Sequence, residues 1–583
     1  MTDRHPTPAT DPQNDSAAAL AVALQTLERS PDDPQLLERT IELLAEWDRF
    51  DEAVARIDHL ATIDPERARV ARARTLEAMN QIMESAQLWR EIHHDDPGDH
   101  SKLVQCIRVL TRAREFDDAM ELIDALRDRR PSGNHWQHRA QVLNVQNRRI
   151  EAFEMGLAEV RAHPDHEGRL RATLRFCHRV LTKDVASGAE PAAHELLDLV
   201  LAGPRDDALI LHHAANVAVT LGRDDDAITL INTPCALGRP DKFDRLRAWA
   251  AYTEGDVDEA RRIWDRIRTT QSVEAIRPLH PGELSRRDTL PMQLDADRIR
   301  VFTVIRNERW RLPWFFSYYR ALGVDEFYVV DNDSTDGSLE LLLEQPDVRV
   351  FHTDTPYRIG RSGMVWLNHL TAQFNAGWNV YVDVDEALVY DDIESHGLRG
   401  LTDHMDRHGH DIACGQMVDM FAVETPGEEP TEAIHDFVTE YPYFDHTYQR
   451  VPTHQCPYFF TTGGIRRLAA TGENQTKSPV SRAGRGIQFL SSSHVVTPGV
   501  ISDVDIGLLH FKLAGDFRRA FSEDSASNDR VGDCRNRYDQ YAEFYADWTG
   551  ASDALDWSTI GRFERSTSLV DHGLIAGLPP TFR

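Results

Sequence analysis

The stretch WNVYVDVDEALVY, Trp378–Tyr390, decides how the C-terminal half of this chain is interpreted. Its first part alternates apolar and polar residues with a period of two, which predicts a β-strand. Three acidic residues follow within four positions, Asp383, Asp385 and Glu386. Two carboxylates in D-x-D spacing lie on the same side of an extended chain, and they repel each other unless a cation lies between them. The pattern predicts a divalent-metal site at a strand end, and a polar strand edge running into a turn is the simpler alternative.

The composition limits the classes of protein to consider. A chain of 583 residues is too long for one core, so about two to four domains are expected. The 95 acidic residues outnumber the 65 basic ones and give a formal charge of −30, which argues against nucleic acid or anionic lipid as partners. Six scattered cysteines with no C-x-x-C predict neither a disulfide framework nor a thiolate zinc site, and fit a reducing compartment.

The N-terminus carries no recognisable targeting segment. Residues 1–15 are polar and proline-rich, which predicts disorder. The apolar run Ser16–Leu27 is too short to span a bilayer and has no basic segment before it, so it is expected to be a first helix. We expect no transmembrane segment and a cytoplasmic protein, attached peripherally to the inner membrane, if at all, through partners.

The N-terminal half contains a repeat. Alanines recur 33 residues apart at Ala53, Ala86, Ala119 and Ala152, and again at Ala227 and Ala260. A fixed period in this range predicts stacked helix pairs, in which a small alanine lets the second helix approach the first. Residues 16–270 are therefore predicted to be a helical array, with an insertion near 183–205. The period fails over residues 271–297, which are predicted to be a linker.

This array resembles the tetratricopeptide family, whose unit is about 34 residues long and carries such an alanine on its second helix. The resemblance implies a surface that binds a protein partner or another copy of the chain. A packing spacer without a ligand is the alternative, and the sequence does not separate the two.

The segment after residue 297 alternates strand and helix patterns. Strands are predicted at Arg298–Asn307, Val324–Asp331, Val348–His352 and in the opening stretch, with helices between them. This order predicts a doubly wound parallel α/β sheet, whose ligands lie beyond the carboxyl ends of the strands. Polar clusters at 306–308, 331–333 and 383–386 follow three of these strands, and their convergence favours a functional site. The chain has no G-x-G-x-x-G after the first strand and no P-loop motif.

The strings TVIRNE, ALGVDEFYVVDNDSTDGS and VYVDVDE, in this order, resemble family 2-type glycosyltransferases of the GT-A fold, in particular a bacterial branch often attached to helical repeats. The resemblance covers about residues 298–530 and leaves 531–583 as a C-terminal helix and tail. It implies transfer of a sugar, with inversion, from a nucleotide-sugar donor to a saccharide or lipid-linked acceptor. It also implies Mn²⁺ or Mg²⁺, because a divalent ion offsets the charge of a leaving diphosphate.

The resemblance also implies roles for individual residues. Metal ligands would be Asp383 and Asp385, with His510 of LLHFK as the third. Asp419 is the candidate catalytic base, together with Asp385 at the reaction centre. A turn cap at Asp419 and a buried core histidine at His510 are the alternatives. Nucleotide-sugar contacts would come from the remaining residues, Asn307, Glu308, Asp331, Asp333, Arg466 of a GG-x-R motif, and Lys512.

Other interpretations stay open. The chain is alternatively a scaffold with an inactive GT-A half, or a nucleotidyltransferase, although RNERW after the first strand is not the glycine-rich basic loop of that class. His404 and His408 in HMDRHGH lie four residues apart and form a possible metal pair on a helix. A solvated helix face explains them better, because no acid completes the set. An amphipathic helix is predicted at Asp533–Trp548, followed by an irregular end.

Overall fold

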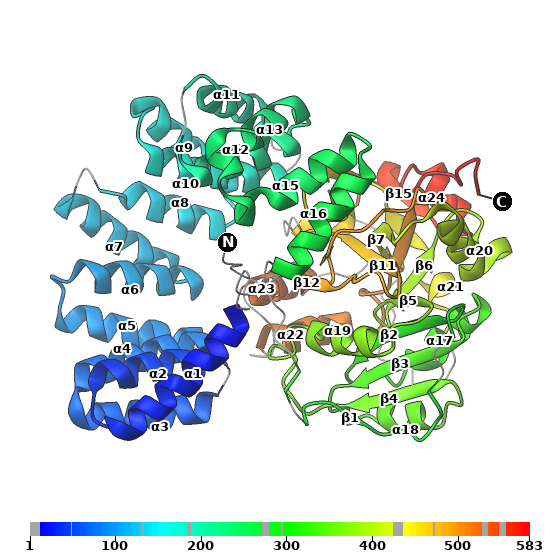
Figure 1. Cartoon of the computed structure of the whole chain (residues 1–583), viewed down its shortest axis with the longest axis horizontal. Coiled ribbons are helices and arrows are strands. Elements are labelled where there is room, and N and C mark those ends of the chain that lie inside the picture. Colours follow the sequence, from blue (N-terminus) through cyan, green and yellow to red (C-terminus); the bar gives the residue numbers. More distant parts are fainter. Residues whose placement is uncertain are drawn as a thin grey trace, which may run out of the picture. The chain divides into compact units, whose positions relative to one another are not determined.

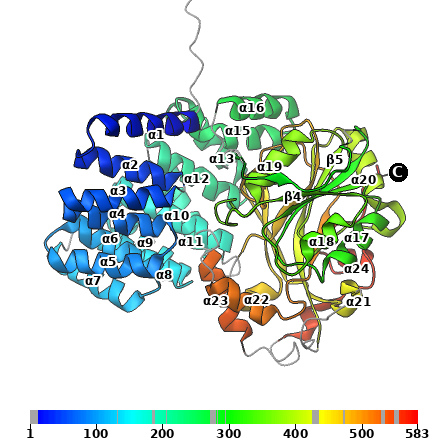
Figure 2. The ribbon, with the colours of Figure 1, turned by 90° about the horizontal axis from the view of Figure 1, so that it is seen from below.

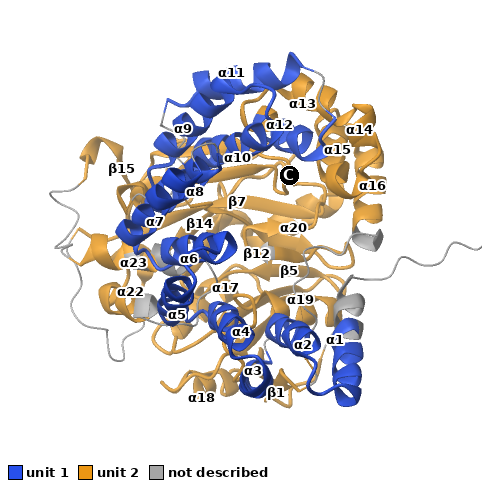
Figure 3. Ribbon diagram, turned by 90° about the vertical axis from the view of Figure 1, so that its left-hand side faces the viewer, with its two compact units in different colours: residues 1–217, 270–272 blue, residues 218–269, 273–583 orange. Residues whose placement is uncertain are grey.

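The computed structural model describes residues 12–47, 49–130, 133–183, 188–203, 206–270, 279–280, 282–292, 295–423, 435–469, 473–526, 534–546 and 555–582 (Figure 1). The chain forms two compact units, which are coloured in Figure 3: residues 1–217 with 270–272, and residues 218–269 with 273–583. Residues 1–11 of the segment predicted to be disordered, 1–15, and 271–278 of the predicted linker lie outside the described residues. Residues 12–15 of that segment are helical, because the first helix begins at Pro12.

The first unit consists of consecutive helix pairs joined by short turns (Figure 1). The helices are α1 (Pro12–Arg29), α2 (Pro34–Glu46), α3 (Phe50–Ile63), α4 (Pro65–Ala78), α5 (Ile82–Asp95), α6 (His100–Arg112), α7 (Phe116–Arg129), α8 (His135–Val145), α9 (Arg149–Ala162), α10 (Glu167–Lys183), α11 (Glu190–Leu201) and α12 (Ala208–Thr220), of which α12 crosses the unit boundary.

The periodic alanines lie where the repeat predicts them. Each of the six is on the second helix of a pair and is fully buried: Ala53, Ala86, Ala119, Ala152, Ala227 and Ala260. Proline and aspartate separate the pairs, as at α4, where the Asp64 carboxylate accepts a hydrogen bond from the Arg67 N–H and Pro65 is the first residue. The segment near 183–205, which was predicted to be an insertion, contains α11, and this helix again buries an alanine, Ala193. The N-terminal half is thus a tetratricopeptide-like helical array.

The last helices of the array belong to the second unit. They are α13 (Asp224–Ile231), α14 (Pro234–Leu237), α15 (Pro240–Thr253) and α16 (Val257–Thr270). Tyr252 of α15 packs against Tyr458 with ring centroids 5.1 Å apart, and its hydroxyl accepts a hydrogen bond from the Ile501 N–H at 3.2 Å. These helices therefore share a core with the sheet described next.

A mixed sheet organises the second unit, with strand order β1–β4–β3–β2–β5–β11–β7–β14–β6. β2 to β5 run parallel to one another, as do β7 and β14, while β1, β6 and β11 are antiparallel to their neighbours. The strands are β1 (Ser285–Arg286), β2 (Ile299–Ile305), β3 (Glu326–Asp331), β4 (Val348–His352), β5 (Trp378–Tyr381), β6 (Glu386–Val389), β7 (Ile412–Phe421), β11 (Thr476–Arg482) and β14 (Ile506–His510).

The predicted fold class, a helical array followed by a GT-A type α/β domain, is confirmed. β2, β3, β4 and β5 were predicted from their apolar runs, whereas β14 and the three antiparallel strands were not. Smaller strands complete the unit: β8 (Tyr443–Asp445), β9 (Tyr448–Pro452), β10 (Phe459–Gly463), β12 (Phe489–Ser492), β13 (Val495–Val496) and β15 (Ile560–Arg562).

Helices cover both faces of the sheet (Figure 2). α17 (Leu312–Ala321), α18 (Ser338–Leu343) and α20 (Ile393–His408) share one apolar core, and α19 (Met364–Gln373) packs into a second core on the other face. Neighbouring residues of β3 alternate between the two cores, with Val329 in the first and Val330 in the second. This alternation follows from the pleat of a strand buried on both sides.

The opening stretch does not stay extended. β5 ends at Tyr381, and the Glu386 N–H donates to the Asp383 carbonyl at 3.0 Å before β6 begins. The prediction that Asp383 and Asp385 lie on the same side of an extended chain was therefore wrong. Apolar and polar residues still alternate from Val382 to Asp385, within this turn. The sequence pattern therefore does not reveal the change of chain direction that lets β6 pair with β14.

The C-terminal part folds onto the same unit. α22 (Phe517–Ala526) and α23 (Cys534–Tyr545) lie side by side (Figure 2), close to the helix predicted there. The end that was predicted to be irregular contains β15, the 3₁₀ turn Trp557–Thr559 and α24 (Thr567–Asp571), and β15 pairs with β8. In the described part of the chain, no helix has both the length and the apolar character needed to cross a membrane.

Candidate active site

Strand register brings three functional side chains to one place. His510, the last residue of β14, is opposite Asp419 on β7 and opposite Glu386, the first residue of β6. Residues directly opposite each other on neighbouring strands have Cβ atoms about 5 Å apart, so their side chains meet. Asp385 precedes Glu386 in the turn and accepts a backbone hydrogen bond from the Phe511 N–H at 2.8 Å.

His510 lies between two carboxylates. Its Nδ1 is 2.5 Å from Asp419 Oδ1, and its Nε2 is 3.4 Å from Asp385 Oδ2. The Asp419 carboxylate only accepts hydrogen bonds, whereas Arg466 Nη2, which only donates, also lies 3.0 Å from Nδ1. The shorter contact, to Asp419, favours a proton on Nδ1, and Nε2 is presented to Asp385. Burial by itself lowers the pKa of His510, but the two carboxylates outweigh it and raise the pKa above its usual value.

Asp419 is enclosed by donors. The Arg466 guanidinium donates to both carboxylate oxygens, from Nε at 2.6 Å and from Nη2 at 2.8 Å, and reaches Glu473 with Nη1 at 3.1 Å. Burial raises the pKa of Asp419, but Arg466 and His510 hold it well below its usual value. Its side chain is 3% exposed. A carboxylate with both oxygens engaged in this way orients His510 and does not suit proton transfer from an acceptor hydroxyl.

One set of side chains matches the donor chemistry of a divalent cation. Single ligand atoms of Asp385, Glu386 and His510 all lie within 4.8 Å of one another. Two carboxylates and an imidazole suit Mn²⁺, and the carboxylates suit Mg²⁺. Carboxylates and an imidazole are of the kind that the ion implied by the fold family takes, and Asp383 is not in this set. Both Glu386 oxygens already accept hydrogen bonds, Oε1 from Lys477 Nζ and Oε2 from the Asp383 N–H at 3.0 Å.

Asp383 has a different partner. Its carboxylate accepts hydrogen bonds from Lys477 Nζ at 2.6 Å and from the Tyr381 hydroxyl at 2.9 Å. Lys477 Nζ also donates to Glu386 Oε1 at 2.5 Å, so this buried ammonium separates the two acids. Burial by itself lowers the pKa of Lys477, but the carboxylates of Asp383 and Glu386 raise it by a larger amount, so Lys477 stays charged. The sequence predicts a cation between the neighbouring acids. At Asp383 this positive charge is the ammonium group of Lys477 on β11.

The loop after β2 reaches this set. Glu308 forms an ion pair with Arg311 at 2.7 Å, and both interact electrostatically with Asp385. Burial and Asp385 raise the pKa of Glu308, against the effect of Arg311. Asn307 holds the loop in place, because its side-chain oxygen accepts a hydrogen bond from the Thr335 N–H at 2.7 Å.

A cavity of about 360 Å³ lies beyond the ends of β2, β3 and β4. Beneath it, the buried Asp331 uses one oxygen for His352 Nδ1 at 3.0 Å, and its Oδ1 has no hydrogen-bond partner among the described residues. The lining contains two arginines and two aspartates, and neither Asp383 nor Asp385 is part of it. The lining residues are Arg306, Asn332, Asp333, Asp354, Thr355, Pro356 and Arg358. Such a lining suits a ligand that carries both phosphate and hydroxyl groups.

Residues 317–473 match the family model described as glycosyl transferase family 2. The sheet domain is therefore a family 2-type glycosyltransferase domain. The match includes Asp385, Glu386 and Asp419 and ends before Lys477 and His510.

Solved structures similar to the chain include tetratricopeptide repeat proteins. A tetratricopeptide repeat protein from Parabacteroides merdae has 9% identity, covers 38% of this chain and 85% of its own, and has a TM-score of 0.28. PilF of Pseudomonas aeruginosa has 14% identity, covers 35% and 90%, and has a TM-score of 0.24. A repeat protein of Cytophaga hutchinsonii has 13% identity, covers 44% and 92%, and has a TM-score of 0.25. At these scores they add nothing to the helix geometry described above, and no curated protein matches the chain.

The glycosyltransferase domain brings together only part of the predicted site. Asp385, His510 and Glu308 lie together, and Asp333 lines the cavity. Arg466 is bound to Asp419, and Lys512 Nζ lies 4.8 Å from the centre of the Tyr538 ring, where it donates to that hydroxyl at 3.2 Å. Neither side chain is among those lining the cavity.

Several residues of the glycosyltransferase domain were not predicted. Asp354 and Arg358 follow β4 in the run TDTPYR, a fourth polar strand end that obeys the same rule as the three that were used. Arg311 lies within a helical pattern, and Lys477 lies in the strand TKSPVSR. Arg311 pairs with Glu308, only three residues away, so its partner was visible in the local sequence. Nothing in the local sequence marks Lys477, because its partners Asp383 and Glu386 are distant in the chain.

Proposed function

We propose that this protein transfers a sugar from a nucleotide-sugar donor to a saccharide or lipid-linked acceptor, by direct displacement with inversion. The family 2 match supports glycosyl transfer in general. Donor, acceptor, stereochemistry and metal dependence are part of the proposal.

A single arrangement carries the proposal. The segment 306–311 joins the cavity, through Arg306, to the set of Asp385, Glu386 and His510, through Glu308 and Arg311. In the proposal, the aspartates of the cavity, Asp333 among them, bind nucleoside hydroxyls, and the cavity arginines bind phosphate oxygens.

Mn²⁺ or Mg²⁺ would be held by Asp385, Glu386 and His510, and would offset the negative charge of the donor diphosphate. Asp419 keeps Nδ1 of His510 protonated, so that Nε2 faces the same point as Asp385. We propose this orienting role for Asp419 in place of that of a general base.

The test is a thermal-shift panel of UDP-, GDP-, CMP- and dTDP-sugars with and without Mn²⁺. A donor at 100 times its Kd stabilises the folded protein by about 2.7 kcal/mol. We expect one nucleotide class to stabilise the protein only with Mn²⁺, and Asp385→Asn to lose this effect. Glu340→Gln, an exposed acid on α18, is the matched control and should keep it.

The alternative, a scaffold with an inactive glycosyltransferase domain, predicts a different result. No sugar nucleotide would then stabilise the chain in an Mn²⁺-dependent way, and Asp385→Asn would behave as wild type. Retained transfer activity in Asp385→Asn would also reject the proposed metal ligand.

The helical array has a binding role in the proposal. A cavity of about 270 Å³ lies between α2 and α4, and its lining includes the three acids Glu38, Glu42 and Glu46. Arg74, also in the lining, forms ion pairs with Glu38 at 3.4 Å and Glu42 at 3.1 Å, so the acids are in excess by two. Opposite charge favours a basic segment of a protein partner. Binding of lysine-rich peptides, measured by fluorescence polarisation, should weaken severalfold in Glu46→Lys. It should not change in Glu84→Lys, an exposed position outside this lining.

A further inference from the structure

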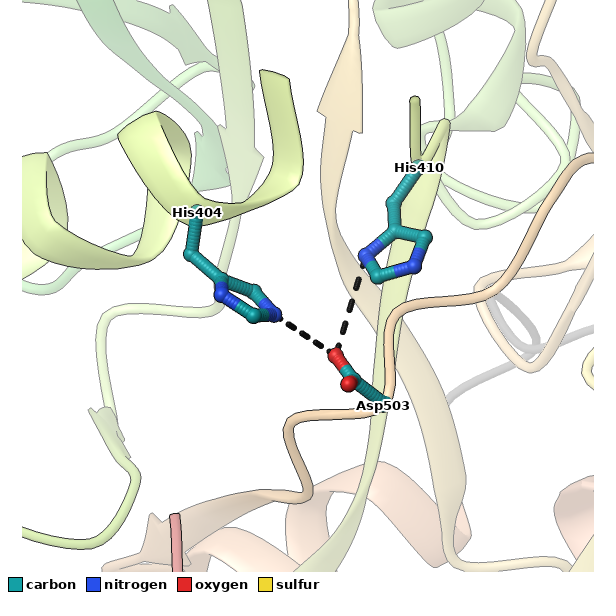
Figure 4. Close-up of side chains that lie close together, drawn as sticks. All are labelled: His404, His410 and Asp503. Carbon is teal, nitrogen blue, oxygen red and sulfur yellow. Dashed lines mark hydrogen bonds and ion pairs between the residues drawn. The ribbon is translucent and has the colours of Figure 1, made fainter. Parts of the chain in front are cut away.

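A second cluster lies at the other end of β7 from Asp419. It contains His404 near the end of α20, His410 just before β7, and Asp503 from the segment that leads into β14 (Figure 4). One ligand atom from each lies within 4.8 Å of the others. No acid next to His404 and His408 in the sequence was predicted to complete a metal site with the histidines. In the folded chain, Asp503 fills this place from about 100 positions further along.

The three side chains point toward one another (Figure 4). His404 Nε2 is 2.7 Å and His410 Nδ1 is 3.8 Å from the same atom, Asp503 Oδ1. In a tetrahedral zinc site with bonds of about 2.0–2.1 Å, ligand atoms are about 3.3 Å apart. The two observed separations lie on either side of this value, so a small rotation of the Asp503 side chain equalises them.

Two ring nitrogens of this cluster have no hydrogen-bond partner among the described residues, His404 Nδ1 and His410 Nδ1. His410 Nδ1 is buried and faces Asp503 Oδ1, but no hydrogen-bond partner is found for it among the described residues. His404 is fully buried, whereas the Asp503 side chain is 46% exposed, which leaves one side open to water and to an entering ion.

Backbone hydrogen bonds hold these residues in place. The Asp411 and Ile412 N–H groups both donate to the Val500 carbonyl, and the Ser502 N–H donates to the Ile412 carbonyl at 2.7 Å. The segments on both sides of the cluster are therefore fixed before any ion binds, which is the condition for a preformed site.

We propose that His404, His410 and Asp503 bind a zinc-type divalent cation, with water as the fourth ligand. Two imidazoles and one carboxylate are typical ligands of Zn²⁺. The ion joins the end of α20 and the start of β7 to the segment before β14, the strand that carries His510 to the glycosyltransferase site. The site is distinct from the proposed Mn²⁺ set and does not depend on the proposed sugar transfer.

His408 provides a matched control. Its ring centroid is 4.5 Å from that of His404 and 5.8 Å from that of His410, but it is exposed and is not in the ligand set. The full-length chain is stripped with a chelator, dialysed against buffered Zn²⁺, and its metal content is measured. Thermal unfolding is followed with and without Zn²⁺.

The expected result is one bound Zn²⁺ in wild type and in His408→Ala, with a raised Tm. Loss of even an outer partner of a metal site lowers affinity about 10–100-fold, so His410→Ala should lower it by at least that factor. Asp503→Asn, which keeps the shape of the side chain, guards against a folding defect, and both variants should melt like metal-free wild type in the absence of Zn²⁺. Asp385→Asn should keep this ion, which separates the site from the proposed active site.

Unchanged Zn²⁺ content and affinity in both His410→Ala and Asp503→Asn would overturn the proposal. An equal loss in His408→Ala would overturn the assigned ligands. If the Zn²⁺ of wild type disappears only in Asp385→Asn, the ion belongs to the other set and the proposal also fails.

Discussion

Replacing Asp419 by Asn distinguishes an orienting residue from a catalytic base. The side chain is buried, accepts two hydrogen bonds from Arg466, and fixes Nδ1 of His510. Removing one partner of a buried ion pair costs about 3–5 kcal/mol, so the free energy of unfolding should fall by that amount. Loss of the carboxylate that orients a metal-binding imidazole lowers metal affinity or activity about 10–100-fold.

The control for this variant is Glu473→Gln. Glu473 is the second carboxylate bound by Arg466, whereas the carboxylate that contacts His510 is Asp419. Urea denaturation should show a comparable loss of stability in both variants. Mn²⁺ titration of nucleotide-sugar binding by calorimetry should show weaker metal dependence in Asp419→Asn alone.

Two results would contradict an orienting role for Asp419. If Asp419→Asn lowers turnover about 10²–10⁴-fold while Mn²⁺ affinity is unchanged, Asp419 acts as a general base after all. If Glu473→Gln weakens Mn²⁺ binding as much as Asp419→Asn does, the effect comes from loosening of the buried network and not from the orientation of His510.

Three further predictions concern stability. Lys477→Met leaves two acids without their shared ammonium and should lower the free energy of unfolding by about 3–5 kcal/mol in urea titrations, whereas no change would mean that the acids are hydrated or protonated. Burial lowers the pKa of His178 and of His213 from 6.5 to about 4. Between these two pH values the unfolded chain therefore binds more protons than the folded chain. The free energy of unfolding should be constant above pH 6.5 and should fall as the pH drops toward 4. Each histidine contributes at most about 3 kcal/mol to this loss. If the hydrogen exchange of α10 and α12 does not change over this pH range, the two histidines are not its cause. Ala152→Leu should overfill the contact between paired helices and lower the stability measured by thermal unfolding by about 1–3 kcal/mol. Ala158→Leu, at an exposed position on the same helix, is the control and should cost little. Equal effects of the two substitutions would exclude overpacking as the cause.

Sequence patterns were sufficient wherever the determining interactions are local or periodic. The alanine period located the helix pairs, because each pair must bury a small residue at the same place. The apolar runs located the parallel strands, and the polar residues after them marked the edge where Asp385 and Glu308 lie. The TDTPYR run after β4 followed the same rule and was available to the same reasoning.

The sequence by itself determined that a helical array precedes an α/β domain, and that acids gather at the carboxyl ends of its strands. It did not determine which charges are partners. Lys477 separates Asp383 from Glu386, Asp419 is bound by Arg466, and Asp503 completes a cluster begun by two histidines far earlier in the chain. These partners are decided by the antiparallel pairing of β6 and β11 and by the packing of the segment before β14. The physical reason is that hydrogen bonds and ion pairs depend on distances within a few ångströms between residues about 50 to 100 positions apart, and only the folded chain sets those distances.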